Sequence, residues 1–218
     1  MIVTIDGPAG AGKSSASREL AKRLGFRFLD TGAMYRAVAL AAMRRGHDWD
    51  QAEVLAELAQ SVRIELTDSQ VLLDGEDVSR KIRTMEVTSL THFAANNSGV
   101  RRRMVELQRQ AAGTDNVVTE GRDQGTVVFP QAECKIFLTA SPEERARRRL
   151  LDLERNGEHV TFEEVLARQT ERDERDSARV DGPLRQADDA IEFCTDNLSE
   201  EEVVDGLARI VESRMAAT

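Results

Sequence analysis

The sequence predicts an α/β fold in which a five-stranded parallel sheet is flanked by helices. Five short apolar segments read as strands, and helical patterns fill most of the sequence between them. A glycine-rich segment directly follows the first strand. Strands that alternate with helices are typical of a parallel sheet covered on both faces. The predicted strands are residues 2–6, 27–31, 116–120, 135–140 and 190–195.

The composition predicts a soluble globular protein. The chain has 218 residues, of which 40% are hydrophobic and 32% charged, and its formal net charge is −9. We expect one domain over residues 1–218 that carries an insertion. The negative charge argues against a nucleic acid polymer as partner, because phosphate contacts need a basic face. No apolar run has the length of a membrane span and no secretory signal is recognisable, so we expect a cytoplasmic location without membrane association.

The cysteine and histidine patterns favour neither a disulfide nor a metal centre. Cys134 and Cys194 each lie in or beside a predicted strand, which predicts reduced and buried thiols. The three histidines lack the spacing of zinc ligands.

The rhythm of the sequence changes between residues 62 and 78. Ile64 and Leu66, followed by Val71 and Leu73, flank the polar turn 67–70, which predicts a β-hairpin. We interpret residues 60–100, approximately, as an insertion. Outside this hairpin and the five predicted strands, most of the patterns are helical. Three predicted helices begin with a hydroxyl residue that is followed three positions later by glutamate, which is the spacing of a capping box. These starts are Ser141, Thr161 and Ser199.

The most informative local feature is the glycine-rich segment. Residues 7–14 read GPAGAGKS and match the pattern G-x-x-x-x-G-K-[ST] between a strand and the predicted helix 14–24. Glycines let successive N–H groups face one anion, and the helix adds its positive end. In such loops the lysine neutralises the β- and γ-phosphates and the hydroxyl binds Mg²⁺. The predicted ATP contacts are Gly7, Pro8, Ala9, Gly10, Ala11, Gly12, Lys13, Ser14 and Ser15.

A second metal-related feature is the apolar strand 116–120, which ends in the carboxylate of Glu120. In phosphate-loop enzymes an acidic residue at this strand end helps to hold Mg²⁺. We therefore predict Ser14 and Glu120 as the Mg²⁺ contacts.

Polar residues follow the second and third strands. Thr31 and Arg36 begin the helical pattern after the second strand, where Thr31 is placed to cap the helix and to meet an acceptor phosphate. Arg122 and Asp123 follow the third strand. The planar fork of Arg122 suits a phosphate, and Asp123 suits the exocyclic amine of cytosine. The alternatives are an ordinary capped helix and a local ion pair.

The segment 171–179 reads ERDERDSAR and places Arg172, Arg175, Asp176 and Arg179 on one helical face. One interpretation is a solvated face with i,i+4 ion pairs. The other is a mobile lid, residues 155–182 approximately, which brings arginines over the phosphates and expels water. Arginines 145, 147, 148 and 149 precede this segment, and their spacing assigns no role to any of them.

These motifs together resemble the bacterial-type cytidylate kinases, a family of P-loop kinases. The resemblance covers nearly the whole chain and includes the segments 5–14, 30–36, 75–79, 82–87, 121–130 and 171–179. It implies five parallel strands, an acceptor-binding insertion, a lid, and the use of ATP to convert CMP or dCMP to the diphosphate. We expect Mg²⁺ to enter with ATP and the protein to be a monomer. By position, the resemblance implies cytosine contacts at Arg101, Asp123 and Arg179, sugar contacts at Arg172 and Asp176, and acceptor-phosphate contacts at Thr31, Arg36 and Arg122.

One position departs from the family pattern. Many members have a small hydroxyl residue near the base where this chain has His92, and Thr88 and Ser89 lie close by in the sequence. Either the register shifts to one of these hydroxyls or a histidine replaces the hydroxyl.

The predicted mechanism is in-line phosphoryl transfer without a covalent intermediate, because the acceptor phosphate is already anionic. Lys13, Arg122 and Arg172 are the predicted catalytic residues, which position the phosphates and neutralise their charge. The alternatives are a P-loop kinase for UMP or a non-nucleotide acceptor, and a nucleotide-dependent switch or silent ATP-binding module. The guanine-reading N-K-x-D motif of the switch class is absent from the sequence.

Overall fold

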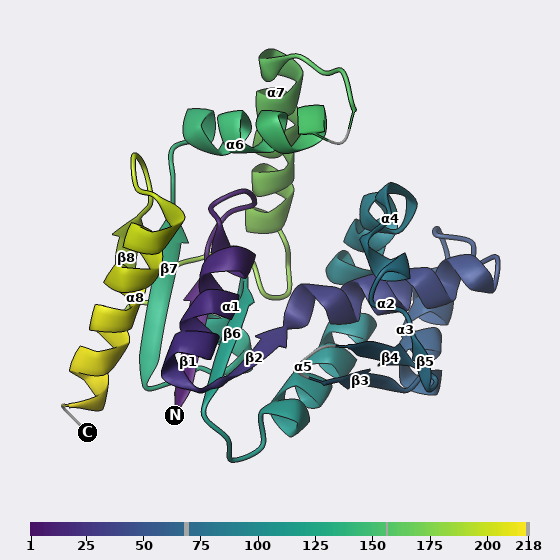
Figure 1. The fold of residues 1–218 in the computed structure, drawn as a ribbon. Coiled ribbons are helices and arrows are strands. Elements are labelled where there is room, and N and C mark those ends of the chain that lie inside the picture. Colours follow the sequence, from purple (N-terminus) through teal and green to yellow (C-terminus); the bar gives the residue numbers. More distant parts are fainter. Residues whose placement is uncertain (68–69, 156, 217–218) are drawn as a thin grey trace. The chain divides into compact units, whose positions relative to one another are not determined.

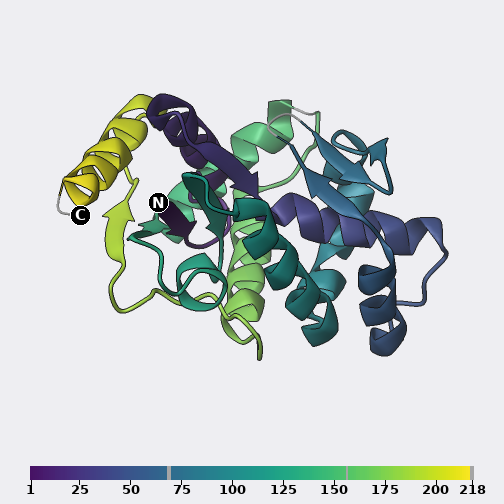
Figure 2. The same cartoon turned by 90° about the horizontal axis from the view of Figure 1, so that it is seen from below.

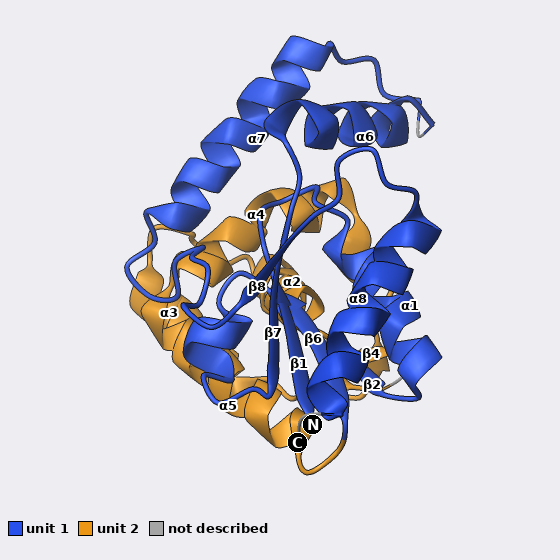
Figure 3. Ribbon diagram, turned by 90° about the vertical axis from the view of Figure 1, so that its left-hand side faces the viewer, with its two compact units in different colours: residues 1–28, 116–218 blue, residues 29–115 orange. Residues whose placement is uncertain are grey.

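The computed structural model describes residues 1–67, 70–155 and 157–216. The described chain forms two compact units, coloured separately in Figure 3. Unit 1 comprises Met1–Phe28 and Asn116–Thr218, and unit 2 comprises Leu29–Asp115. The predicted insertion at residues 60–100 therefore falls within unit 2.

The five-stranded sheet, which lies in unit 1 except for the last two residues of β2, confirms the predicted fold class. Its order is β2-β6-β1-β7-β8, and the central strand β1 pairs in parallel with β6 and β7, while β7 pairs in parallel with the edge strand β8. All five predicted strands are present, with ends that differ by one residue at several positions. The bounds are β1 Ile2–Asp6, β2 Arg27–Asp30, β6 Val117–Gly121, β7 Cys134–Thr139 and β8 Ile191–Cys194.

Two pairs of helices complete unit 1. Helices α1 (Lys13–Leu24) and α8 (Glu200–Met215) lie side by side against the sheet (Figures 1 and 3), and their apolar faces bury Leu20 and Leu207 against Ile5 and Leu138. Helices α6 (Pro142–Arg155) and α7 (Phe162–Ser177) pack against each other. The segment with the predicted lid motif is therefore a helix of unit 1.

Unit 2 is built around helix α2 (Thr31–Arg44). The helix contacts α3 (Ala52–Ser61), α4 (Met85–Asn96), α5 (Ser98–Ala112) and the strands β3 (Ile64–Leu66) and β4 (Val71–Leu73) (Figure 2). The strands β3 and β4 pair as the predicted antiparallel hairpin, although its turn residues Asp68 and Ser69 lie outside the described chain. The short strand β5 (Glu76–Asp77) and the 3₁₀ turn η1 (Lys81–Arg83) were not predicted. Strand β5 consists of two exposed residues, which carry no strand pattern.

The predicted capping boxes were confirmed at two helices, and a third box is only half formed. Thr161 and Ser199 form reciprocal capping boxes, and the Ser141 hydroxyl accepts the Glu144 N–H at 3.3 Å. The Ser141 N–H donates to the carboxylate of Asp196 at 2.9 Å and not to Glu144. The predicted cap of a fourth helix, at Thr31, is wrong, because Thr31 is already the first residue of α2. The cap is Asp30, whose carboxylate accepts the Ala33 N–H at 2.9 Å.

Two further observations concern the cysteines and the lengths of the helices. Both cysteines are free thiols, but only Cys134 is buried. The prediction of a buried Cys194 is wrong because Cys194 ends the edge strand β8. Within the described residues, every helix is too short or too polar to cross a membrane.

Gly206 provides a test of the packing of α8 on the sheet. A Cβ at Gly206 would lie 2.4 Å from Cζ of Phe193 on β8. Alanine is favoured over glycine in a helix by about 1 kcal/mol, but overpacking costs about 1–3 kcal/mol. We expect Gly206→Ala to lower the free energy of unfolding, as measured by chemical denaturation. The same change combined with Phe193→Leu should recover most of the loss, and a more stable single variant would contradict this packing.

Candidate phosphoryl-transfer site

The glycine-rich loop begins where β1 ends and leads directly into α1. Its conformation requires glycine, as Gly7 and Gly12 illustrate. At Gly7 a Cβ would lie 2.0 Å from the carbonyl oxygen of Leu138 on β7, and Gly12 has φ 86° at the N-terminus of α1. The loop therefore approaches the neighbouring strand more closely than any side chain permits, and it presents the N-terminus of α1 as a site for anions.

Lys13 is buried at the start of α1, and its ammonium donates to the carbonyl oxygen of Pro8 at 2.7 Å. Burial, together with the positive charges of Arg122 and Arg172, lowers the pKa of Lys13 to about 7 against the opposing effect of Glu120 and Asp6. The lysine is thus held inside its own loop, in surroundings that become more favourable for its charge when an anion arrives.

Asp6 connects the glycine-rich loop to the segment after β6. Its carboxylate accepts the N–H of Gln124 at 2.8 Å and the N–H of Gly125 at 2.7 Å, and burial raises its pKa to about 6 despite these bonds. The segment Gln124–Val128 forms one π-helical turn, in which the Val128 N–H reaches the carbonyl of Asp123. Turns of this kind occur frequently at functional sites.

Arg122 and Arg179 are held together by one carboxylate. Asp176, near the end of α7, accepts from Nε of Arg122 at 2.8 Å through one oxygen and from Nη2 of Arg179 through the other. Burial raises the pKa of Asp176, but the two guanidinium groups outweigh this effect and hold the pKa below its ordinary value. The predicted site residues Arg122, Asp176 and Arg179 are therefore brought together within unit 1.

The remaining predicted residues of unit 1 lie around the same strand ends. Asp123 and Glu120 are buried, and Glu120 is aligned with Ile5 in the register of β6 and β1, one residue before Asp6. Ser14 and Ser15 are exposed in the first turn of α1. Arg172 is exposed on α7, and its charge acts on Lys13. The ion pair between Arg172 and Asp176 expected for a solvated helical face is replaced by pairing of Asp176 with Arg122 and Arg179.

Unit 2 carries a second arginine cluster, arranged around Asp30. Besides capping α2, the Asp30 carboxylate pairs with Nη2 of Arg36 at 3.2 Å and with Nη2 of Arg83 at 2.8 Å. Gly32 permits this arrangement, because a Cβ there would lie 3.1 Å from Nη1 of Arg36. Thr31 is buried beside the cap.

Arg101 and His92 occupy different environments in unit 2. Arg101 is buried, its guanidinium lies 5.7 Å from the ring centroid of Tyr35, and Nη1 donates to the carbonyl of Ala95 on α4. His92 is exposed on α4, where Nδ1 lies 2.7 Å from the carbonyl oxygen of Ser89 and the ring contacts Phe93.

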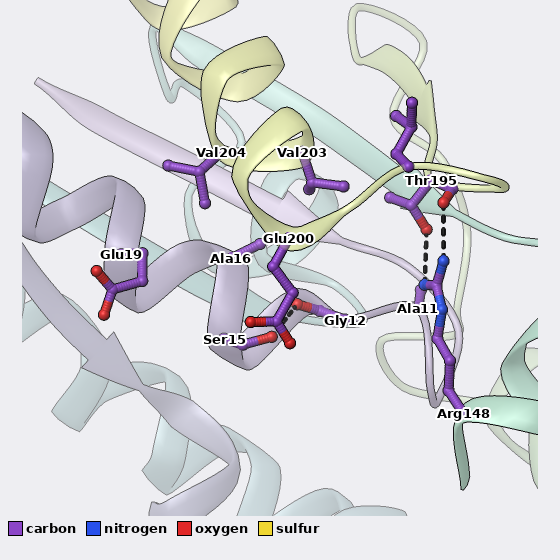
Figure 4. Close-up of a pocket in the computed structure, with 11 residues that line it drawn as sticks. Ala11, Gly12, Ser15, Ala16, Glu19, Arg148, Thr195, Glu200, Val203 and Val204 are labelled. Atoms are coloured by element: carbon purple, nitrogen blue, oxygen red, sulfur yellow. Dashed lines mark hydrogen bonds between the residues drawn. The ribbon is translucent and has the colours of Figure 1, made fainter. Parts of the chain in front are cut away.

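A cavity of about 120 Å³ lies beside the glycine-rich loop (Figure 4). On one side it is lined by Ala11, Gly12 and Ser15, and on the other by Arg148 and by residues of the connection between β8 and α8. The guanidinium of Arg148 is fixed by bonds to the hydroxyl and the carbonyl of Thr195, at 3.0 and 2.8 Å, shown as dashed lines in Figure 4.

Sequence reasoning assigned no role to Asp6, Arg83 or Arg148. Each is defined by a partner distant in sequence, with separations of 118 residues for Asp6 and Gln124, 53 for Arg83 and Asp30, and 47 for Arg148 and Thr195. The only local signal was at Asp6, the carboxylate that directly precedes the glycine-rich loop.

Comparison with known proteins identifies the family of the chain. The family model of cytidylate kinase matches residues 3–213. The chain belongs to the cytidylate kinase family. A cytidylate kinase of Rhodopirellula baltica is 51% identical over 218 residues, covering 100% of this chain and 95% of the relative. A cytidylate kinase of Mycobacterium leprae is 48% identical and covers 100% of this chain and 98% of its own length.

Solved structures support the fold. A shikimate kinase from Bacteroides thetaiotaomicron superposes with a TM-score of 0.51 at 14% identity and covers 97% of this chain and 98% of its own. Membership of the cytidylate kinase family makes the chain an enzyme, a nucleoside monophosphate kinase, which decides against the switch and the silent ATP-binding module considered from the sequence.

The lowered pKa of Lys13 predicts that ATP binding is linked to proton uptake. Because this pKa is about 7 in the ligand-free enzyme, Lys13 is largely neutral at pH 8, and phosphate oxygens favour the ammonium form. We expect ATP binding at about pH 8 to take up a fraction of a proton, measured by calorimetry in buffers of different ionisation enthalpy. Lys13→Arg should abolish this uptake because arginine stays protonated. Equal uptake by this variant would contradict the role of Lys13.

Proposed function

We propose that this member of the cytidylate kinase family transfers the γ-phosphate of ATP to CMP and dCMP, with Lys13, Arg122 and Arg172 as the catalytic residues. The observation that carries the proposal is the convergence, within unit 1, of the glycine-rich loop, the buried Lys13 and the Arg122–Asp176–Arg179 cluster. The names of the relatives support cytidine monophosphates as the acceptor, and the convergence of these groups supports this part of unit 1 as the phosphoryl-transfer site.

For ATP, the proposed phosphate contacts are the backbone and side chains of residues 7–15. The adenine ring is assigned to the cavity beside Ala11, Gly12 and Ser15, because this cavity adjoins the phosphate loop (Figure 4). Arg148 offers a flat guanidinium at its wall, already fixed by Thr195 and therefore able to stack without losing further side-chain entropy.

The residues present fit Mg²⁺ brought in with ATP. Among the described residues no cluster of three or more His, Cys, Asp or Glu side chains is suited to bind a metal on its own. Mg²⁺ commonly uses only one or two protein oxygens together with substrate phosphates and water. The exposed Ser14 hydroxyl and the Glu120 carboxylate at the strand end are such ligands. The ion would neutralise charge on the β- and γ-oxygens.

For the acceptor, each unit supplies a set of proposed contacts. In unit 2, Thr31 and Arg36 bind the acceptor phosphate and Arg101 binds the base. In unit 1, Arg122 binds the phosphate, Asp123 and Arg179 read the base, and Arg172 and Asp176 bind the sugar. The pairing of Asp176 with Arg122 and Arg179 supports these roles, because it orients both guanidinium groups before the substrate binds. Monomeric state and cytoplasmic location stay predictions.

The chain's contribution to the reaction is positioning and charge neutralisation. The acceptor phosphate oxygen is anionic near neutral pH, so no strong general base is needed. Lys13 leaves the Pro8 carbonyl for the phosphate oxygens, and Arg122 and Arg172 supply donors for the equatorial oxygens in the transition state. A lid that excludes water directs the phosphoryl group to the acceptor.

The proposal is tested by measuring ADP formation from ATP–Mg²⁺ with CMP, dCMP, UMP, AMP and GMP in parallel. We expect strong preference for CMP and dCMP. Lys13→Ala should keep the melting curve but lose most of the turnover, since the lysine acts on phosphate charge. Activity near that of the wild type in this variant, or no turnover with any nucleotide, would overturn the proposal.

Asp123→Asn tests the reading of the base. The amide keeps the shape of the carboxylate but offers donors as well as an acceptor, so it no longer rejects the carbonyl oxygen of uracil. A good polar contact to a base is worth about 1–3 kcal/mol of discrimination, so the ratio of kcat/KM for CMP over UMP should fall about tenfold or more. Glu171→Gln, an exposed change on α7, serves as the control. An unchanged ratio in Asp123→Asn would remove Asp123 as the base reader.

A further inference from the structure

Both backbone polar groups of Ala9, in the middle of the phosphate loop, bond to side chains of other elements. The Ala9 N–H donates to Oδ1 of Asp173 on α7 at 3.3 Å, and the Ala9 carbonyl accepts from Nη1 of Arg145 on α6 at 2.9 Å. Arg145 and Asp173 also pair directly at 2.5 Å. One loop residue and one residue from each of two helices therefore form a closed ring of hydrogen bonds.

Arg145 is the fixed member of this ring. Its side chain is buried, and Nε donates to the carbonyl of Ala140 just after β7, so the guanidinium is held from the sheet side. A buried guanidinium without a carboxylate is strongly unfavourable. The ion pair therefore stabilises Asp173, and with it the middle of α7, beside Arg145.

The contacts of α7 with the loop and its neighbours extend over two turns of the helix. Gln169, one turn before Asp173, is buried and donates to the Arg145 carbonyl at 3.3 Å, and a Cβ at Gly10 would lie 2.7 Å from its Nε2. Asp176, in the following turn, holds Arg122. Positions 169, 173 and 176 thus dock α7 onto the loop and onto the segment after β6.

We propose that Arg145 and Asp173 are positioning residues that fix the phosphate loop and α7 to each other, so that Arg172 reaches the transferred phosphoryl group. Arg172 directly precedes Asp173, and its charge already acts on Lys13. Neither member of the pair is assigned a contact with the reacting atoms. They act through Ala9 on the loop and through α7 on Arg172, and this inference rests on the proposed function.

Loss of the Arg145–Asp173 pair should affect the transition state more than substrate binding. A misplacement of about 1 Å can cost about 100-fold in rate, and a loosened α7 admits water to the phosphoryl group. Loss of the pair should therefore lower kcat and raise the fraction of ATP hydrolysed without phosphate transfer to the acceptor. KM for CMP should change little.

The kinetic experiment compares Arg145→Met, Asp173→Asn and the double variant with two controls. The controls are Arg147→Met on α6 and Glu174→Gln on α7, both at exposed positions next to the pair. We expect each single variant to lower kcat by about 10- to 100-fold and to increase uncoupled ATP hydrolysis. The kcat of the double variant should be no lower than that of the less active single variant. The controls should stay within about twofold of the wild type. Independent, multiplying losses would overturn the proposal, as would a raised KM with kcat unchanged.

A second measurement does not depend on activity. Hydrogen–deuterium exchange of ligand-free protein should become faster in Asp173→Asn for peptides that cover both residues 7–14 and α7, while Glu174→Gln leaves both unchanged. Faster exchange throughout the molecule would instead indicate a general loss of stability and contradict a specific positioning role. Exchange that stays as in the wild type would also contradict it. If Arg145→Met fails to fold, Asp173→Asn alone still decides the outcome.

The two proposals fail in distinguishable ways. Wild-type protein without activity on any nucleotide would reject the proposed function, while coupled exchange in the loop and α7 would still support the pairing. Normal CMP phosphorylation in Asp173→Asn with unchanged exchange would reject the positioning role and leave the proposed function intact.

Discussion

The geometry of unit 1 depends on the buried carboxylate of Asp6. It stands at the end of the central strand β1, directly before the phosphate loop, and accepts two backbone N–H groups from the π-helical turn after β6. Two loops that follow different strands are thereby held in one arrangement. A buried carboxylate is unfavourable unless donors surround it, and these donors are available only while the loop after β6 keeps its shape. Arg122 and Asp123 directly precede Gln124 in the sequence. Their position therefore depends on the hydrogen bonds that Gln124 and Gly125 donate to Asp6.

A second constraint is the positive charge that each unit, taken by itself, concentrates in its arginine clusters. Without substrate, closely placed guanidinium groups repel one another, and the protein balances them with carboxylates. Asp30 holds Arg36 and Arg83, Asp176 holds Arg122 and Arg179, and Asp173 holds Arg145. Each pairing restricts long side chains before a ligand arrives, which reduces the entropy lost on binding. The lowered pKa of Lys13, which is bonded to its own loop, reduces the average positive charge and with it the repulsion.

The parts of the proposed site that can be predicted from the sequence are those in which neighbouring residues form one motif. The phosphate loop needs its glycines, lysine and serine in one turn, so its spacing is visible in the sequence. Arg122 and Asp123 are proposed because they follow an apolar strand, and Asp176 because it shares a motif with Arg172 and Arg179. Thr31 was misjudged as a cap because Asp30, one residue earlier, competes for the same N–H groups and reaches the Ala33 N–H. Arg145 looked equivalent to three neighbouring arginines, since nothing in the local pattern separates a buried side chain from exposed ones.

The sequence by itself determined the five-strand parallel sheet, the phosphate loop, the hairpin and the class of reaction, because hydrophobic periodicity, glycine spacing and capping residues act over a few positions. Only the tertiary structure decided the partner of each buried carboxylate. Asp6 and the Gln124 N–H, Asp173 and Arg145, and Asp176 and Arg122 are separated by 118, 28 and 54 residues. The physical reason is that a buried carboxylate takes as its partner whichever hydrogen-bond donor or opposite charge the packed chain brings close to it, and short-range patterns carry no record of that choice.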